Sequence, residues 1–592
     1  MFPGGSDISR GLHGERCRAG IAATAALALV LAGCGSPSSK NGSGAGGTAE
    51  ITTQQSAMDP DAKGPAPEVA GAVKGGTLTV YAEAVPTSFD PTDTYYADAT
   101  VMEKLFLRTP TQYALRDGKP VLVPDLTDLG AVSADKLTWT FKMTGAYKYE
   151  DGTDVKVEDL AYAVKRSFAH DVYPDGPTYQ LSYFKDGDKY KGPYTDGDTF
   201  AGVETQGTDT LVIHLAKPFA DLPFFMAFPM FTPIPKARDT KQEYKNHPLA
   251  TGPYMFAEYV AGTSLTLTKN PHWDPGTDPV RHQYVDGWSF RWGGDAVSTQ
   301  QRVLNSAGAD ASSVQAEEID SSLIPQLTGD KAKQLSTGQS PCLYVLNIDT
   351  RKIPDINVRK AIAKAINWDA ISKANGNNPY TAQPASTFLS PSVPGYEQYP
   401  PYPDLTGTGS GDPEGAKKIL IDAGKLGFAL SWYYDNTLPI PQQRSAIRAD
   451  NLTKAGFTVK AIGASSAVIR AKAGDYNAPV NLDQAPRGWC SDWPTGSSWL
   501  PTLFESRAVA EGTSWGMQQD KALDAEIEAV AALPAEQATG KWAALDRKIM
   551  GRYVALPWYY GKTAFVVGSK VGGAEADPTQ GQPSYLGMFL RR

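Results

Sequence analysis

The sequence predicts a protein of mixed α/β or α+β class with more than one domain, for three reasons. The chain has 592 residues, 41% of them hydrophobic, which is enough for two or more separate cores. Segments that alternate like strands occur together with segments of helical period. The 44 prolines and 57 glycines are spread along the whole chain, as expected where many short elements are joined by loops.

The N-terminus has the features of a bacterial lipoprotein signal. Three arginines precede the apolar run AGIAATAALALVLAG, which ends directly before Cys34. A basic end, a short apolar segment and small residues at the cleavage site are typical of a secretory signal. Because Leu31–Cys34 resembles a lipobox, residues 1–33 are predicted to be removed and Cys34 to be acylated, which would anchor the chain at a membrane surface. The alternative is an ordinary signal peptide with an incidental cysteine.

Residues 34–74 are predicted to form a flexible tether, because GSPSSKNGSGAGGTAE and the chain after it are too polar and glycine-rich to build a core. The folded part is predicted to begin near Gly75. Loss of the signal removes Cys17, which leaves Cys342 and Cys490 as the thiols of the folded part. Outside the cytoplasm such a pair is expected to form a disulfide, and the alternative is two buried free thiols.

Charge and motif content argue against several classes of protein. The net charge of −8 gives no basic surface for a nucleic acid, and no apolar tract is long enough to span a bilayer. The chain has no HExxH and no two histidines at metal-ligand spacing, so neither a metal nor another cofactor is predicted. One G-x-S-x-G match, Gly512–Gly516, would make Ser514 the nucleophile of a secreted hydrolase. No apolar strand precedes it, so a chance match in a loop is the preferred interpretation.

Strands and helices can be placed along the folded part. Strands are predicted at the start of Gly75–Pro91, at Thr138–Met143, at Thr210–Leu215, and as a pair within Ala250–Trp273. Helices are predicted after the turn at Asp151-Gly152, where Leu160, Val164 and Phe168 recur at helical spacing, over Val358–Asn367, and over Asp412–Gly424 with Asp412 as N-cap.

These segments, in this order, resemble the large extracytoplasmic solute-binding proteins of ABC importers, the group that includes the oligopeptide- and dipeptide-binding proteins. The resemblance runs from about Gly75 to the C-terminus. Its strongest parts are LTWTFKMTGAYKYEDGTDVKVEDLAYAVKRSF, ATGPYMFAEY with NPHW behind it, and NVRKAIAKAIN. At Lys156 the family usually has a hydroxyl residue that caps a helix, so a small loss of helix stability is expected.

The resemblance implies an α/β fold of the periplasmic-binding-protein type, with two lobes, a hinge and a deep cleft between the lobes. Crossover strands would lie near residues 340 and 540. Closure of the lobes would bury a solute and present the shape that a membrane permease recognises. A monomer without enzymatic activity is implied. The implied parts are residues 75–109, 201–341 and 541–592 for lobe I, 110–200 for its accessory subdomain, and 342–540 for lobe II.

The segment GWCSDWPTGSSW, residues 488–499, holds three of the 12 tryptophans, one of the four cysteines and an acid close to two rings. Its pattern is neither helical nor strand-like, and loop tryptophans with one wet edge make good pocket walls. In relatives a stretch like GWCSDW lies at the cleft wall, where its Gly-Trp-Cys backbone, here Gly488–Cys490, runs beside the peptide. The acid that holds the peptide's α-amino group there corresponds to Asp492. A buried ammonium needs such a partner, although an acid that caps its own loop is the alternative.

The same resemblance gives expectations for neighbouring residues. Trp489 is expected to contact the ligand, Trp493 either to contact it or to be core, and Trp499 to be core. Relatives pair a cysteine at the position of Cys490 with one at that of Cys342, which would fix the loop to the hinge. A disulfide closing roughly 150 residues contributes ~4–5 kcal/mol in the chain-entropy model.

Val85, Pro86 and Thr87 correspond to a loop whose backbone meets the peptide in relatives. Arg487 is interpreted as a solvated arginine, with a peptide carboxylate as its other possible partner. An oligopeptide is the favoured ligand because Asp492 suits a cationic group. A dipeptide, another small amine or an oligosaccharide are the alternatives, and a sugar would use the tryptophans.

Overall fold

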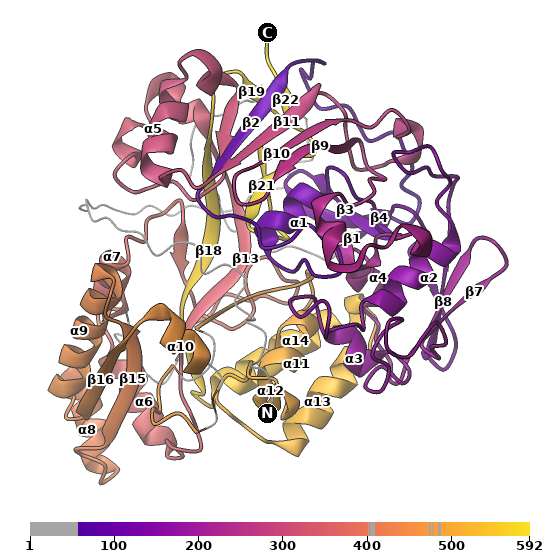
Figure 1. Ribbon diagram of the computed structural model, residues 1–592. Helices are drawn as coiled ribbons and strands as arrows, with labels where there is room; N and C mark the ends of the chain where they lie inside the picture. Colours follow the sequence, from indigo (N-terminus) through magenta and orange to yellow (C-terminus); the bar gives the residue numbers. More distant parts are fainter. Residues whose placement is uncertain (1–56, 401, 403–408, 473–474, 476, 484–486) are drawn as a thin grey trace, which may run out of the picture.

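Two long strands, β13 (Leu335–Asn347) and β18 (Ala555–Val567), run antiparallel through the middle of the molecule and connect two lobes (Figure 1). The computed structural model describes residues 57–400, 402, 409–472, 475, 477–483 and 487–592. Both strands belong to a nine-stranded sheet of order β17-β13-β18-β12-β2-β11-β10-β9, with β14 also paired to β18. One sheet therefore continues from lobe to lobe, and the predicted two-lobed α/β fold is confirmed.

Lobe I is built on the part of this sheet around β2, where β2 lies parallel to both β11 and β12. Leu78 and Val80 of β2 are buried at alternate positions and pack with buried Trp288 and Phe290 of β11. The elements of lobe I are β2 (Thr77–Ala82), α1 (Ala97–Glu103), β9 (Tyr254–Val260), β10 (Ser264–Lys269), β11 (Gly287–Trp292), α5 (Ala296–Asn305), β12 (Ser313–Gln315), β19 (Val571–Gly572), β20 (Glu575–Asp577), β21 (Gln582–Ser584) and β22 (Phe589–Leu590).

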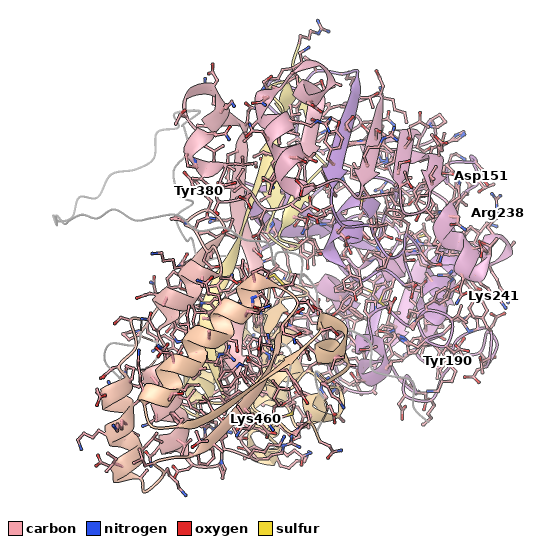
Figure 2. All side chains as sticks on the ribbon, turned by 60° about the vertical axis from the view of Figure 1, so that its left-hand side comes forward. Asp151, Tyr190, Arg238, Lys241, Tyr380 and Lys460 are labelled. Carbon is pink, nitrogen blue, oxygen red and sulfur yellow. A yellow bond between two sulfur atoms is a disulfide. The ribbon has the colours of Figure 1, made fainter. Side chains whose placement is uncertain are left out.

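The accessory subdomain packs beside lobe I and has a four-stranded sheet, β5-β6-β8-β7, a three-stranded sheet, β1-β4-β3, and its own hydrophobic core. Asp151, Arg238 and Lys241 project from its outer side in Figure 2. The elements are β1 (Ala57–Met58), β3 (Thr111–Arg116), β4 (Lys119–Pro124), β5 (Ala131–Val132), β6 (Thr138–Lys142), α2 (Val157–Arg166), α3 (Tyr179–Tyr183), β7 (Val203–Gln206), β8 (Thr210–His214) and α4 (Leu222–Phe225).

Lobe II surrounds the other end of the crossing strands with helices and a parallel pair, β15 and β16. Among the described residues, no helix has both the length and the apolar character needed to cross a membrane. The elements of lobe II are α6 (Ile356–Ala365), α7 (Trp368–Ala374), β14 (Ala382–Pro384), α8 (Pro413–Asp422), β15 (Ala429–Asp435), α9 (Pro439–Lys454), β16 (Thr458–Ala464), α10 (Ser466–Lys472), β17 (Gly488–Cys490), α11 (Leu500–Phe504), α12 (Arg507–Ala510), α13 (Lys521–Ala531) and α14 (Ala535–Met550).

The elements expected from periodicity are present, with one shift along the chain. Strands β2, β6, β8, β9 and β10 and helices α2 and α8 confirm the predictions, and Asp412 caps α8 by accepting from the Gly415 amide at 2.8 Å. At α2 the backbone N–H of Lys156 donates to Asp159 at 3.0 Å, which replaces part of the missing cap. The helix predicted at 358–367 is α6, which ends earlier because Asn367 serves as the N-cap of α7.

Residues 57–74 do not form a free tether. β1 pairs parallel with β4, the Val69 amide donates to the Tyr284 hydroxyl at 3.0 Å, and Ala66 is buried. Backbone pairing and a buried side chain fix this stretch even though its composition is that of a linker. Residues 1–56, with the predicted signal, Cys34 and most of the tether, lie outside the described residues.

The boundaries between the parts also differ from those implied by the resemblance. The core of the accessory subdomain extends from Tyr95 to Leu249, well beyond 110–200. Helix α14 packs in the core of lobe II, so the boundary at 541 falls inside a lobe II helix, and the second crossing strand is β18 rather than a segment near 540. The first crossing strand, β13, lies where it was predicted.

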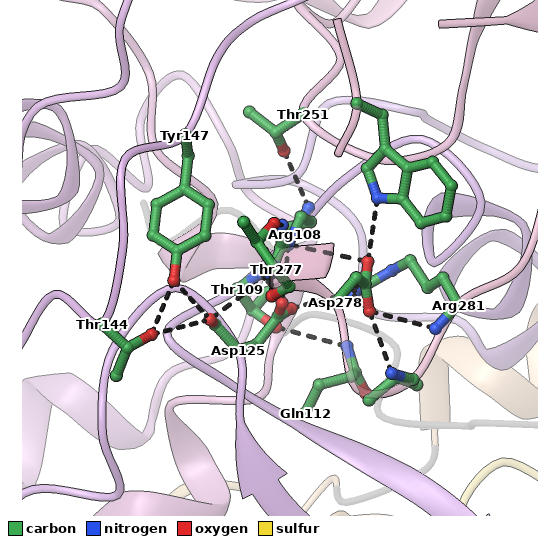
Figure 3. Close-up of polar contacts among 12 residues, drawn as sticks. Arg108, Thr109, Gln112, Asp125, Thr144, Tyr147, Thr251, Thr277, Asp278 and Arg281 are labelled. Carbon is green, nitrogen blue, oxygen red and sulfur yellow. Dashed lines mark hydrogen bonds and ion pairs between the residues drawn. The ribbon is translucent and has the colours of Figure 1, made fainter. Parts of the chain in front are cut away.

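A buried ion cluster joins the accessory subdomain to lobe I (Figure 3). Arg108 lies 2.7 Å from Asp125, and Arg281 lies 3.0 Å from Asp125 and 3.2 Å from Asp278. Burial opposes ionisation of Asp278, but the two guanidinium groups outweigh it and lower the pKa of this carboxyl. Two cations and two anions therefore balance within a site that excludes water, and each charge depends on the others.

We predict that Asp278→Asn lowers the free energy of unfolding by about 3–5 kcal/mol, because two buried guanidinium groups are then left with one carboxylate. Urea denaturation measures the change. The matched control is Asp450→Asn, which removes an exposed i,i+4 partner of Lys454 and is expected to cost less than about 0.5 kcal/mol. Equal losses in the two variants would contradict the prediction.

Candidate functional site

The loop that carries the predicted ligand residues begins at β17 and is fixed to the crossing strand β13. The two strands pair antiparallel with Cys342 opposite Cys490, and the two sulfurs are bonded. The predicted disulfide is confirmed. Gly488 lies opposite Tyr344, and a Cβ at Gly488 would lie 2.9 Å from that ring, so only glycine permits this close approach.

Asp492 follows this strand and is buried at the interface between the lobes, with 2% of its surface exposed. Its Oδ2 accepts a hydrogen bond from the Tyr95 hydroxyl at 2.9 Å and another from the Tyr179 hydroxyl. Both tyrosines belong to the core of the accessory subdomain, so an acid of lobe II receives these bonds from across the interface. Burial and the charge of Asp492 raise the pKa of Tyr179, so this hydroxyl stays protonated and acts as a donor.

A small cavity of about 10 Å³ lies against Asp492. This volume is close to the minimum that admits one water molecule, and an ammonium group is of similar size. Apart from Asp492, the wall comes from lobe I and the accessory subdomain, and it includes Lys104, Tyr113, Phe228 and Gln580.

The lysine in the cavity wall already has an acidic partner. Lys104 lies 2.5 Å from Asp577, and both side chains are buried. Burial opposes ionisation of Asp577, but the Lys104 ammonium and hydrogen bonds from Thr579 outweigh it and lower the pKa of this carboxyl. Asp492 is the carboxylate among the residues that line the cavity, and Asp577, which pairs with Lys104, is not one of them.

The rings of the loop tryptophans lie in hydrophobic cores. Trp489, 5% exposed, donates from Nε1 to the Ser498 carbonyl at 3.0 Å within the core of lobe II, and Trp499 is core as predicted. Trp493, 2% exposed, packs in the core of the accessory subdomain. Neither Trp489 nor Trp493 lines the cavity at Asp492, because this loop lies where two cores meet and each core takes one indole.

The other predicted contacts lie away from this cavity. Val85 and Thr87 are exposed and Pro86 is buried in the loop after β2. That loop is attached to lobe I, because the amides of Glu83 and Ala84 donate to one Glu317 oxygen at 2.5 and 3.3 Å.

Arg487 is not simply solvated. It donates to the Tyr433 carbonyl at 2.6 Å and lies 3.5 Å from Asp483, which ties it to lobe II.

The surroundings of Ser514 do not fit the nucleophile of a hydrolase. Ser514 is fully buried, and its hydroxyl has no hydrogen-bond partner within the part of the chain that the structure describes, so no base activates it. Over the same residues, no cluster of three or more His, Cys, Asp or Glu side chains is arranged to hold a metal ion.

Sequence analysis did not find Tyr95, Tyr179, Lys104 or Phe228. Tyr179 lies in a five-residue helix without a useful period, and Tyr95 lies in a loop before α1. Their partner is about 300 to 400 residues away along the chain, and no local pattern encodes a contact of that kind. Single aromatic residues of this kind could have been found only by locating Asp492 in the fold.

Two lobes joined by paired crossing strands, with a buried acid of one lobe facing a cavity walled by the other, define a two-lobed binding protein. Residues 121–511 match the family model described as "Bacterial extracellular solute-binding proteins, family 5 Middle". The chain belongs to this family of extracellular solute-binding proteins.

Curated and solved relatives agree with this assignment. The chain is 24% identical over 485 residues to the periplasmic oligopeptide-binding protein OppA of Escherichia coli K12, covering 74% of this chain and 79% of OppA. It is 26% identical over 487 residues to di/tripeptide-binding protein 4 of Pseudomonas aeruginosa UCBPP-PA14, covering 77% and 84%. Among solved structures, the clavulanic acid biosynthesis oligopeptide binding protein 2 superposes with a TM-score of 0.80 at 25% identity, covering 90% of this chain and all of that one.

We predict that the double variant Cys342→Ser/Cys490→Ser loses about 4–5 kcal/mol of unfolding free energy, since the disulfide closes a loop of 148 residues in the unfolded chain. Urea denaturation gives the value. As an independent check, alkylation of the denatured, unreduced protein followed by mass spectrometry is expected to leave both cysteines unmodified. Alkylation at both positions would show that the bond is absent.

Proposed function

We propose that this chain is the peptide-capturing component of an ABC importer. It binds an oligopeptide between its lobes, closes around it and delivers it to permease subunits at the membrane, with Asp492 accepting the peptide's terminal ammonium group. The single observation that carries this proposal is the position of Asp492, a buried carboxylate of lobe II that faces a cavity walled by the opposite lobe.

The chemistry of the cavity supports an ammonium as the group recognised. Tyr95 and Tyr179 both donate to one oxygen of Asp492, which stabilises the charged form of this carboxylate. A cation placed in the cavity would be neutralised at short range in a region of low dielectric. A peptide is much larger than this cavity, so in this proposal it enters while the lobes stand further apart.

The names of the relatives support a peptide as the cargo. OppA and the clavulanic acid biosynthesis protein are named for oligopeptides, and the Pseudomonas protein for di- and tripeptides. An oligosaccharide bound through residues 488–499 would stack on open indole faces. Trp489, Trp493 and Trp499 have their rings in hydrophobic cores, so the segment that suggested a sugar offers no stacking surface.

We predict that Asp492→Asn weakens binding of free peptides by roughly 2–5 kcal/mol, because the amide keeps the shape of the side chain but removes the charge that pairs with the ammonium. Calorimetry with a defined peptide pool measures the loss, and N-acetylated versions of the same peptides are expected to bind wild-type protein weakly. Asp450→Asn, on α9 in lobe II, serves as the control with unchanged binding. If acetylation left the affinity unchanged, Asp492 would not be the amine anchor. Binding of oligosaccharides alone would refute the peptide assignment.

The N-terminal segment supports anchoring of this component on the outer face of the membrane through a lipid on Cys34. We predict that Cys34→Ala releases the protein from the membrane fraction, because acyl chains at this position are its membrane attachment. Labelling of cells with a radioactive fatty acid, followed by fractionation, measures this, with Cys17→Ala as the control that stays labelled and membrane-bound. Release of the wild-type protein without label would show an ordinary cleaved signal instead.

A further inference from the structure

A short piece of lobe II, Trp493–Ser498, inserts into the accessory subdomain. The indole of Trp493 packs against four aromatic rings of that subdomain, with ring centroids 4.9 to 6.3 Å away. Trp493 is the fully buried member of the accessory core that comes from lobe II, and partly buried Ala535 of α14 also packs against this core. The four rings are those of Tyr179, Phe219, Phe225 and Phe228.

The same insertion satisfies a buried acid of the accessory subdomain. Asp221, at the start of α4, is 5% exposed. One of its oxygens accepts from Trp493 Nε1 at 3.1 Å and from the hydroxyls of Thr495 and Ser497. The three donors to its side chain all belong to the other lobe. Among the described residues no lysine or arginine pairs with Asp221. Burial raises the pKa of this carboxyl and the three donors act in the opposite direction.

Separation of lobe II from the accessory subdomain would break this contact as a unit. Trp493 would leave its aromatic site, and Asp221 would lose all three donors at once and depend on water for its hydrogen bonds. Because the donors to Asp221 come from lobe II, these hydrogen bonds favour the closed arrangement of the lobes with or without a ligand.

The contact between Trp493 and the accessory subdomain adjoins the predicted amine site at Asp492. Trp493 directly follows Asp492 in the chain, and the ring of Tyr179 packs on Trp493 while its hydroxyl donates to Asp492. One tyrosine therefore contacts both the carboxylate proposed to bind the ligand and the indole that fills the accessory core.

We propose that Asp221 together with Trp493, Thr495 and Ser497 forms an interlobe latch, meaning a contact that sets the balance between open and closed forms. The ring of Tyr179 is part of the aromatic site that receives Trp493. This inference does not depend on the identity of the ligand, since the latch acts between the lobes of the protein itself.

Small-angle X-ray scattering of the purified protein without added peptide tests the latch. Trp493→Ala and Asp221→Ala are expected to increase the radius of gyration relative to wild type. The control is Phe200→Ala, which removes an aromatic ring from the same core where it stacks on Tyr190, away from lobe II. It is expected to lower stability without changing the radius of gyration. Unchanged scattering in both latch variants, or equal expansion in the control, would overturn the proposal.

Milder variants test the latch if Trp493→Ala does not fold. Thr495→Val combined with Ser497→Ala removes two donors to Asp221 and leaves the aromatic core intact, and it is expected to expand the protein as well. Tyr179→Phe keeps the ring and is expected to scatter like wild type, while Tyr179→Ala expands. Expansion of Tyr179→Phe equal to that of Tyr179→Ala would show that the hydroxyl bond to Asp492, rather than the latch, holds the lobes together. Because no peptide is used, these outcomes are separate from failure of the proposed function, which calorimetry reports.

Discussion

Two carboxylates buried between the lobes accept hydrogen bonds from groups that the opposite lobe supplies, and these bonds connect the parts at the centre of the molecule. Asp492 takes its bonds from two tyrosines of the accessory subdomain, and Asp221 takes its own from three residues of lobe II. The two acids lie on opposite sides of one interface, and each accepts hydrogen bonds from the part of the protein across it. Each acid would therefore lose hydrogen bonds if the lobes separated.

The position of the loop between the acids follows from covalent and hydrogen-bonded attachment to the hinge. The Cys342–Cys490 bond and the β13–β17 pairing fix the start of the loop to a strand that runs through both lobes. In the proposed closure, movement at the crossing strands would carry Asp492 and Trp493 with it. A residue attached in this way would follow the hinge, whereas one on a free loop would move independently of it.

The accessory subdomain has more than a supporting role in this arrangement. It holds the tyrosines that bind Asp492, the acid that receives the lobe II loop, and the aromatic site for Trp493. It is itself held to lobe I by the buried cluster of Arg108, Asp125, Asp278 and Arg281. This cluster is balanced in charge and excludes water, so it resists relative movement of the parts that it joins. The interface that opens in our proposal is thus the one with lobe II.

The sequence by itself determined the mixed α/β class and the positions of several strands and helices, since these depend on local periodicity and caps. The pairing of Cys342 with Cys490 and the choice of Asp492 followed from the resemblance of one short segment to a known family. The sequence did not determine that residues 57–74 pack on the subdomains, because β1 is stabilised by pairing with a distant strand and not by its own composition. Nor did it determine the surroundings of Trp489, which was expected to contact the ligand, or of Trp493, which was equally suited to a pocket wall or a core. Both rings lie in hydrophobic cores. Only the tertiary structure decided this, because the surroundings of an indole or a carboxylate at an interface come from residues hundreds of positions away that local sequence cannot specify.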